Sequence, residues 1–158
     1  ITILDYCMEI SEFKNIIWDY TRKIEESANT ALGNMGAIHG LTAMQLRILM
    51  EVNRKDCCTI GGLAENVCIA GTNLSTMCKK LEKQGYLERK RDIKDERVVR
   101  ISLTIMGRNV VCGLDEYFTR GISRNISKEC FENIIFGMEC LNNLLKEMGS
   151  LTKEEEIK

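Results

Sequence analysis

The sequence predicts a mainly helical (α+β) protein, in which a winged helix-turn-helix module is flanked by long helices at both ends. Three observations lead to this class. Apolar residues recur at helical spacing over most of the chain, and the pattern changes to alternation only between about residues 86 and 103. The 158-residue chain contains no proline, so glycine and capping residues alone mark the expected helix ends.

The first expected element is a long helix over about residues 4–32, followed by a loop at Gly33, Gly36 and Gly40. A helix of this length extends about 42 Å. That is more than a small module can cover, so part of its apolar face is expected to contact a second chain.

Three shorter helices and a hairpin follow. Thr42 is expected to cap a helix over 43–54 and Thr59 a helix over 60–67, and Gly85 to end a helix over 71–84. The alternating stretches 86–91 and 97–103 are predicted to be strands joined by a polar turn. This order is that of a helix-turn-helix with a β-wing.

Two helices complete the chain, one from the expected cap Thr104 to about residue 121 and one from Ser127 to about residue 148. The tail over 151–158 contains three adjacent glutamates and is expected to be frayed. The predicted organisation is therefore a helical dimerisation region over 1–40 and 105–150, with the winged module over 41–104.

Composition excludes several classes of protein. Apolar residues make up 44% of the chain, without a long apolar run or a charged-then-apolar leader, so no membrane span is expected and a cytoplasmic location is predicted. The first residue is Ile, which leaves a preceding segment open. Eight cysteines are scattered through helical segments, without a C-x-x-C pair, and are interpreted mostly as small core residues. With one histidine, His39, no metal or cofactor is expected.

The charge of the chain is unevenly distributed. The formal net charge is −1, yet residues 79–100 carry 9 basic and 5 acidic side chains, while the segments on both sides are acidic. A local basic stretch in an acidic protein is typical of a phosphate-binding surface.

The candidate DNA-binding residues follow from helix phase and from the basic hairpin. Short polar groups and two lysines fall between the apolar positions of the fourth helix: Thr72, Asn73, Ser75, Thr76, Lys79 and Lys80. The hairpin adds four cations that suit a narrow minor groove: Arg89, Arg91, Lys94 and Arg97. Each element alone also fits an ordinary solvated surface. Their succession in the sequence favours contact with adjacent grooves of double-stranded DNA.

From about Leu41 to Gly107 the sequence resembles the MarR family of bacterial regulators. The resemblance rests on Leu41-Thr42 with Gln45, on Leu63-Ala64, on Leu81-Glu82-x-x-Gly85 with Arg89, and on Asp95-Glu96-Arg97 followed by Leu103-Thr104-x-x-Gly107. It implies a homodimer that binds a pseudo-palindromic operator, usually as a repressor. It also implies release by a small phenolic or lipophilic ligand or by cysteine oxidation.

The sequence does not decide between release by a ligand and release by cysteine oxidation. A ligand pocket is predicted between the dimer helices and the winged module, with core packing as the alternative for each residue: Trp18, Met35, Ile38, His39 and Met44. Thiol sensing is the second hypothesis, although Cys7 does not align with the reactive cysteine of the hydroperoxide-sensing branch.

Arg97 matches the arginine of the family's wing signature and is predicted to enter the minor groove, with Asp95 holding its guanidinium. The alternative is a purely structural pair that stiffens the hairpin. An enzyme is not expected, because the sequence contains no recognisable nucleophile motif and no glycine-rich phosphate loop. A protein-binding antirepressor of the same fold is a further alternative, against which the basic wing argues.

Overall fold

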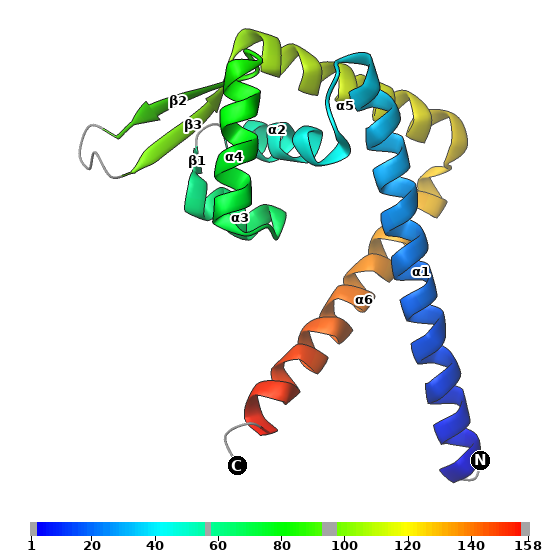
Figure 1. Ribbon diagram of the computed structural model, residues 1–158. Helices are drawn as coiled ribbons and strands as arrows, with labels where there is room; N and C mark the ends of the chain where they lie inside the picture. The colour runs from blue at the N-terminus through cyan, green and yellow to red at the C-terminus, as the bar shows by residue number, and fades with distance from the viewer. Residues whose placement is uncertain (1–2, 56–57, 93–97, 156–158) are drawn as a thin grey trace. The chain divides into compact units, whose positions relative to one another are not determined.

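A computed structural model describes residues 3–55, 58–92 and 98–155. The chain divides into two compact units, Ile1–Leu114 and Asp115–Lys158. The first unit contains a long helix and the winged module, and the second contains the end of one helix and the whole of the last (Figure 1). The predicted fold class is confirmed: the chain is mostly helical and has one small antiparallel sheet.

Helix α1 (Ile3–Ile38) is longer than the sequence predicted, because it continues through Gly33 and Gly36. Its end is a Schellman motif: the amide of Leu41 donates to the carbonyl of Gly36 at 2.9 Å, and Gly40 adopts φ +65°. A Cβ on Gly36 would lie 2.3 Å from the Leu41 carbonyl oxygen. The glycine therefore permits this close approach and does not break the helix, so the expected loop over 33–40 was wrong in its extent.

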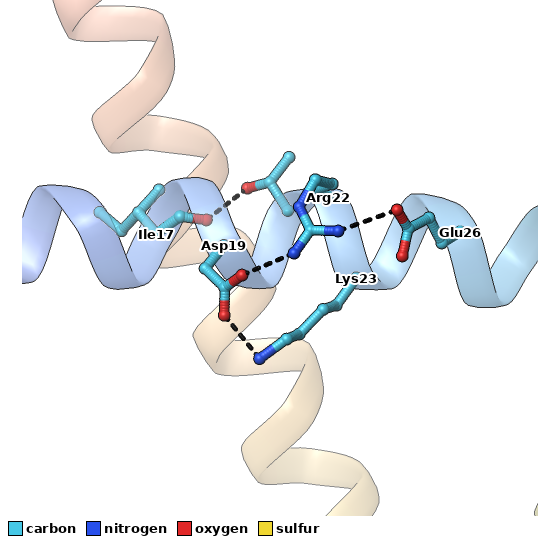
Figure 2. A network of polar contacts seen from close by, with 6 residues as sticks. Ile17, Asp19, Arg22, Lys23 and Glu26 are labelled. Atoms are coloured by element: carbon cyan, nitrogen blue, oxygen red, sulfur yellow. Dashed lines mark hydrogen bonds and ion pairs between the residues drawn. The ribbon is translucent and has the colours of Figure 1, made fainter.

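The solvent side of α1 carries a network of ion pairs (Figure 2). Asp19 accepts from Arg22 at 2.9 Å and from Lys23, and Arg22 also reaches Glu26 at 2.9 Å. Hydrogen bonds from Lys23 and then Arg22 lower the pKa of Asp19. All of these side chains are exposed, so the network supports the helix only weakly.

Helix α2 (Ala43–Lys55) begins with a reciprocal cap, as expected. The amide of Gln45 donates to the Thr42 hydroxyl at 3.2 Å, and the amide of Thr42 donates to the Gln45 side-chain oxygen at 2.9 Å. Gln45 is buried, and its side-chain nitrogen reaches Gln84 at 3.4 Å. This contact joins the start of α2 to the residue that ends the helix over Gly71–Lys83.

The helix-turn-helix consists of α3 (Ile60–Val67) and α4 (Gly71–Lys83). Thr59 caps α3 by accepting from the amide of Gly62, and Cys68 ends it with φ 53°. Helix α4 ends before Gly85, which has φ +83°. The module core is formed by apolar side chains that are almost completely buried: Leu46, Ile48, Leu49, Leu63, Leu74, Leu81 and Ile101.

The wing is a sheet of three strands in the order β1-β3-β2. Strands β2 (Leu87–Arg91) and β3 (Val99–Leu103) form the predicted hairpin, with Arg89 opposite Ile101. The two-residue strand β1 (Cys58–Thr59) was not predicted and pairs with β3, so that Cys58 lies opposite Ile101. The turn between β2 and β3 lies mostly outside the described residues.

Helices α5 (Ile105–Asn125) and α6 (Lys128–Glu155) begin at the predicted caps. The amide of Gly107 donates to the Thr104 hydroxyl at 3.1 Å, and the amide of Cys130 donates to the Ser127 hydroxyl at 3.2 Å. Both helices end later than expected. Helix α6 extends to Glu155, into the segment that was expected to be frayed.

Candidate nucleic-acid interface

Helix α4 has one buried face and one polar face. Leu74, Cys78 and Leu81 are completely buried in the module core. The other predicted residues lie on the opposite side, where Ser75 is half-buried and the rest are exposed: Thr72, Asn73, Thr76, Lys79 and Lys80. Short hydrogen-bonding groups thus stand near the start of the helix and two cations further along it, an arrangement that suits base edges and phosphates in a groove.

The start of α4 has no side-chain cap. Ala70 occupies the N-cap position without a side-chain hydrogen bond, and the first turn contains no acidic residue. The N-terminus of a helix carries partial positive charge and unpaired amide donors. A helix start of this kind is suited to an anion.

Strand β2 carries two further exposed cations, Lys90 and Arg91, which alternation places on opposite faces of the sheet. Arg91 is exposed, and the exposed Lys90 lies 3.0 Å from a carboxylate oxygen of Glu88. Hydrogen bonds from Lys90 and then Ser102 hold the pKa of Glu88 below its usual value. Lys94, Asp95 and Arg97, which were predicted for the wing tip, lie outside the described residues.

Arg89 lies in a different place from the other predicted cations. Its side chain is 18% exposed, and its Nη1 approaches the Oε2 atom of Glu82 in α4 at 3.5 Å. The alternation of β2 could have indicated this, because Arg89 is in phase with the buried Leu87. The number of basic residues in the hairpin does not reveal which face of the strand carries each of them.

The winged module and the chain as a whole match known proteins in sequence. The MarR family profile matches residues 41–99. The transcriptional regulator SarZ of Staphylococcus aureus strain USA300 is 32% identical over 123 residues, which cover 77% of this chain and 75% of SarZ. The chain belongs to the MarR family.

Solved structures agree with this family in fold. A MarR regulator from Methanosarcina mazei Go1 superimposes with a TM-score of 0.69 at 22% identity, covering 84% of this chain and 98% of that one. A mutant of MarR from E. coli complexed with operator DNA gives a TM-score of 0.63 at 14% identity, covering 89% and 99%. As a MarR-family protein, the chain is a transcriptional regulator and not an enzyme.

The five residues predicted to form the MarR-family ligand pocket come from α1, the turn after it and α2. Trp18 and Ile38 are 57% and 73% exposed in the single chain, and His39 is also exposed, while Met35 and Met44 are half-buried. The pocket remains a prediction. An open hollow of about 610 Å³, which was not predicted, lies along the second half of α5 and is lined by Tyr117, Phe118, Arg120 and Arg124 among others.

The cysteines differ from expectation. Of those whose side chains are described, Cys78 is buried and Cys58 is half-buried, whereas the other four are exposed in the single chain: Cys68, Cys112, Cys130 and Cys140. The interpretation of most cysteines as core residues was therefore wrong for these four. Helical spacing alone did not distinguish the inner face of a helix from the outer one.

Neither a metal site nor a membrane span is found in the described part of the chain. In 3–55, 58–92 and 98–155, no group of three His, Cys, Asp or Glu side chains could hold a metal ion. Over the same ranges, no helix is both long and apolar enough to cross a membrane.

Proposed function

We propose that this MarR-family regulator is a homodimer that binds a pseudo-palindromic operator, with α4 in the major groove and the wing in the adjacent minor groove. The observation that carries the proposal is the exposed polar face of α4 beside the exposed cations of β2. The second half of α4 and all of β2 fall in the basic stretch 79–100 of an otherwise acidic chain. Such a surface provides phosphate contacts for affinity and base contacts for sequence preference.

Within this proposal the residues have different roles. Thr72, Asn73 and Ser75 lie early on α4 and are assigned to base edges, with Thr76 beside them. Lys79 and Lys80 are assigned to phosphates. Arg91, Lys94 and Arg97 are assigned to the minor groove, and Asp95 to orienting Arg97. A regulator that acts on chromosomal DNA would work in the cytoplasm.

We further propose that DNA binding represses transcription and that a small phenolic or lipophilic ligand releases the protein. Ile38 exposes apolar surface at the end of α1, where the half-buried Met35 and Met44 also lie, which supports a ligand site completed by a second copy. Trp18 lies about 30 Å from Ile38 along the same helix, so it would join this site only from the second copy. Trp18 is the single tryptophan of the chain, so its fluorescence would report on a ligand bound in such a dimer. Titration with a panel of phenols should change that fluorescence and weaken operator binding at the same concentrations.

Thiol oxidation is the second candidate signal. It is favoured by the four exposed cysteines, since a sensing thiol must be accessible. Replacing each of them with serine in turn, and comparing operator binding before and after peroxide, separates this route from ligand release. If peroxide leaves binding by the wild type unchanged, the redox candidate is excluded.

The deciding experiment is selection of binding sites from random DNA, followed by fluorescence anisotropy at several salt concentrations. We expect an inverted repeat with half-sites about 34 Å apart, or one turn of DNA. Affinity should fall steeply as salt rises. Failure to enrich any sequence, with no salt-dependent binding to genomic fragments, would favour the antirepressor alternative instead.

A further inference from the structure

The register of the wing places Arg89 on the inner face of the sheet. Arg89 lies opposite Ile101, and Ile101 lies opposite Cys58, so these residues form one row across the three strands. Residues that are directly opposite in an antiparallel pair share a face. Ile101 is completely buried, whereas Glu88 hydrogen-bonds to its opposite residue Ser102 on the other face.

Helix α4 packs against β2, at one end of this row. The side chain of Arg89 crosses from β2 to Glu82 in the last turns of α4, where Nη1 and Oε2 are 3.5 Å apart. The positive charge of Arg89 also acts on Cys78, one turn earlier in α4, and opposes the burial that raises the pKa of this thiol to about 11. Arg89 therefore extends beneath α4, on the face of the sheet opposite to Lys90.

An arginine in this position is costly. The Nε atom of Arg89 is buried and has no hydrogen-bond partner among the described residues. The ion pair with Glu82 does little to offset that cost, because the carboxylate is 40% exposed and the distance is long. An apolar side chain of similar size would be expected to leave the unfolding midpoint of the protein about the same.

We propose that Arg89 and Glu82 are positioning residues that fix the angle between α4 and the wing. With this angle fixed, α4 reaches the major groove while the wing reaches the adjacent minor groove. The inference rests on the proposed DNA-binding function. Arg89 joins the two elements assigned to different grooves, and its guanidinium points toward α4. Arg89 should therefore raise the affinity for the operator more than the affinity for other DNA. A residue that contacts a phosphate would raise both affinities equally.

The test compares Arg89→Met, Glu82→Gln and the double variant, with Lys90→Met as the matched control. Lys90 is the next residue of β2, carries the same charge, and lies on the opposite, exposed face. The measurements are the ratio of operator affinity to random-DNA affinity, the salt slope of each, and the thermal unfolding midpoint.

For Arg89→Met we expect the affinity ratio to fall about fivefold or more, with the salt slope and the unfolding midpoint retained. Glu82→Gln should lower the ratio in the same direction, and the double variant should be no worse than Arg89→Met alone. Lys90→Met should instead lower both affinities alike. An equal loss of both affinities in Arg89→Met, with a salt slope smaller by about 1, would assign Arg89 to a phosphate and overturn the proposal.

A second measurement does not require DNA. In the free protein, Arg89→Met should speed amide exchange in β2 and β3 and leave exchange in α2 unchanged, because the variant lacks the contact between Arg89 of the wing and Glu82 of α4. Unchanged exchange in the strands would overturn the positioning role even if the protein bound no DNA. Absence of DNA binding by the wild type would instead overturn the proposed function.

Discussion

At the scale of the residue, α4 separates two kinds of polar group along one helix face. Thr72 and Asn73 lie in the first turn, whereas Lys79 and Lys80 lie in the second half of the helix. Threonine and asparagine can discriminate bases by hydrogen bonds, while a lysine ammonium acts mainly as a point charge. The two groups should therefore respond differently to mutation.

Replacement of Lys79 or Lys80 with alanine should weaken binding to all DNA sequences about equally. Each lost phosphate contact should reduce the salt slope by about 1, because fewer counterions are released on binding. The measurement is operator and random-DNA affinity at several salt concentrations. Lys146→Ala is the control, since Lys146 is exposed on α6, outside the winged module. A changed base preference with an unchanged slope would contradict the assignment.

Cys78 gives a prediction on stability at high pH. Burial raises the pKa of its thiol from 9.0 to about 11. Below pH 9 the thiol is protonated in both states, but between about pH 9 and 11 the unfolded chain loses this proton while the folded chain keeps it. The stability that Cys78 contributes should therefore be lost as pH rises through this window, by an amount of about 3 kcal/mol.

The difference in the free energy of unfolding between wild type and Cys78→Ala isolates this effect from other groups that titrate there. It should shrink as pH rises from about 9 to 11. In native protein near pH 8, Cys78 should also resist alkylating reagents that modify the exposed Cys68. A pH-independent difference, or equal labelling rates, would argue against a buried neutral thiol.

At the scale of the element, the helices and the hairpin were predictable because their apolar periods agree with their caps. Thr42, Thr59, Thr104 and Ser127 all cap helices as expected, through a hydroxyl that accepts a backbone amide. Strand β1 was not predictable, since two residues are too few to show alternation. Its pairing with β3 is determined by tertiary contact.

Tertiary contacts also limited how much of the candidate interface could be predicted from the sequence. Helix phase was enough to place the polar face of α4, because the buried Leu74, Cys78 and Leu81 define the inner side. The inward side chain of Arg89 depends on the register of β2 against β3, which composition does not reveal. The density of positive charge over residues 79–100 indicated the candidate interface. The pairing of β2 with β3 determines which of these cations are exposed on it.

The end of α1 offers a matched pair of glycine substitutions. Gly36→Ala should lower the free energy of unfolding, because its Cβ would lie 2.3 Å from the Leu41 carbonyl oxygen and something must shift. Gly33 lies one turn earlier in the same helix, and a Cβ added there would meet nothing within 4 Å, so Gly33→Ala should stabilise by about 0.5–1 kcal/mol. Urea unfolding of the two variants measures both effects. Stabilisation by both substitutions would show that the Schellman motif does not depend on Gly36.

At the scale of the whole molecule, both units expose large apolar side chains. On α1 these include Phe13, Trp18, Tyr20 and Ile24. Helix α6 exposes a longer series: Phe131, Ile134, Ile135, Met138 and Met148. A monomer in water rarely presents apolar surface along whole helices, and such surface typically marks an interface. A second copy of the chain is the partner that the proposed palindromic operator requires.

We therefore expect a dimer by light scattering at micromolar concentration, with an unfolding midpoint that rises with protein concentration. Ile134→Asp should dissociate or unfold the protein, because it places a charge among the exposed apolar residues of α6. Asn143→Asp is the control: it also adds one negative charge to α6 and, nine residues further along, lies on the opposite side of the helix. A folded monomer in the wild type would contradict the dimer, and equal effects of the two variants would show that charge alone, and not the apolar face, controls assembly.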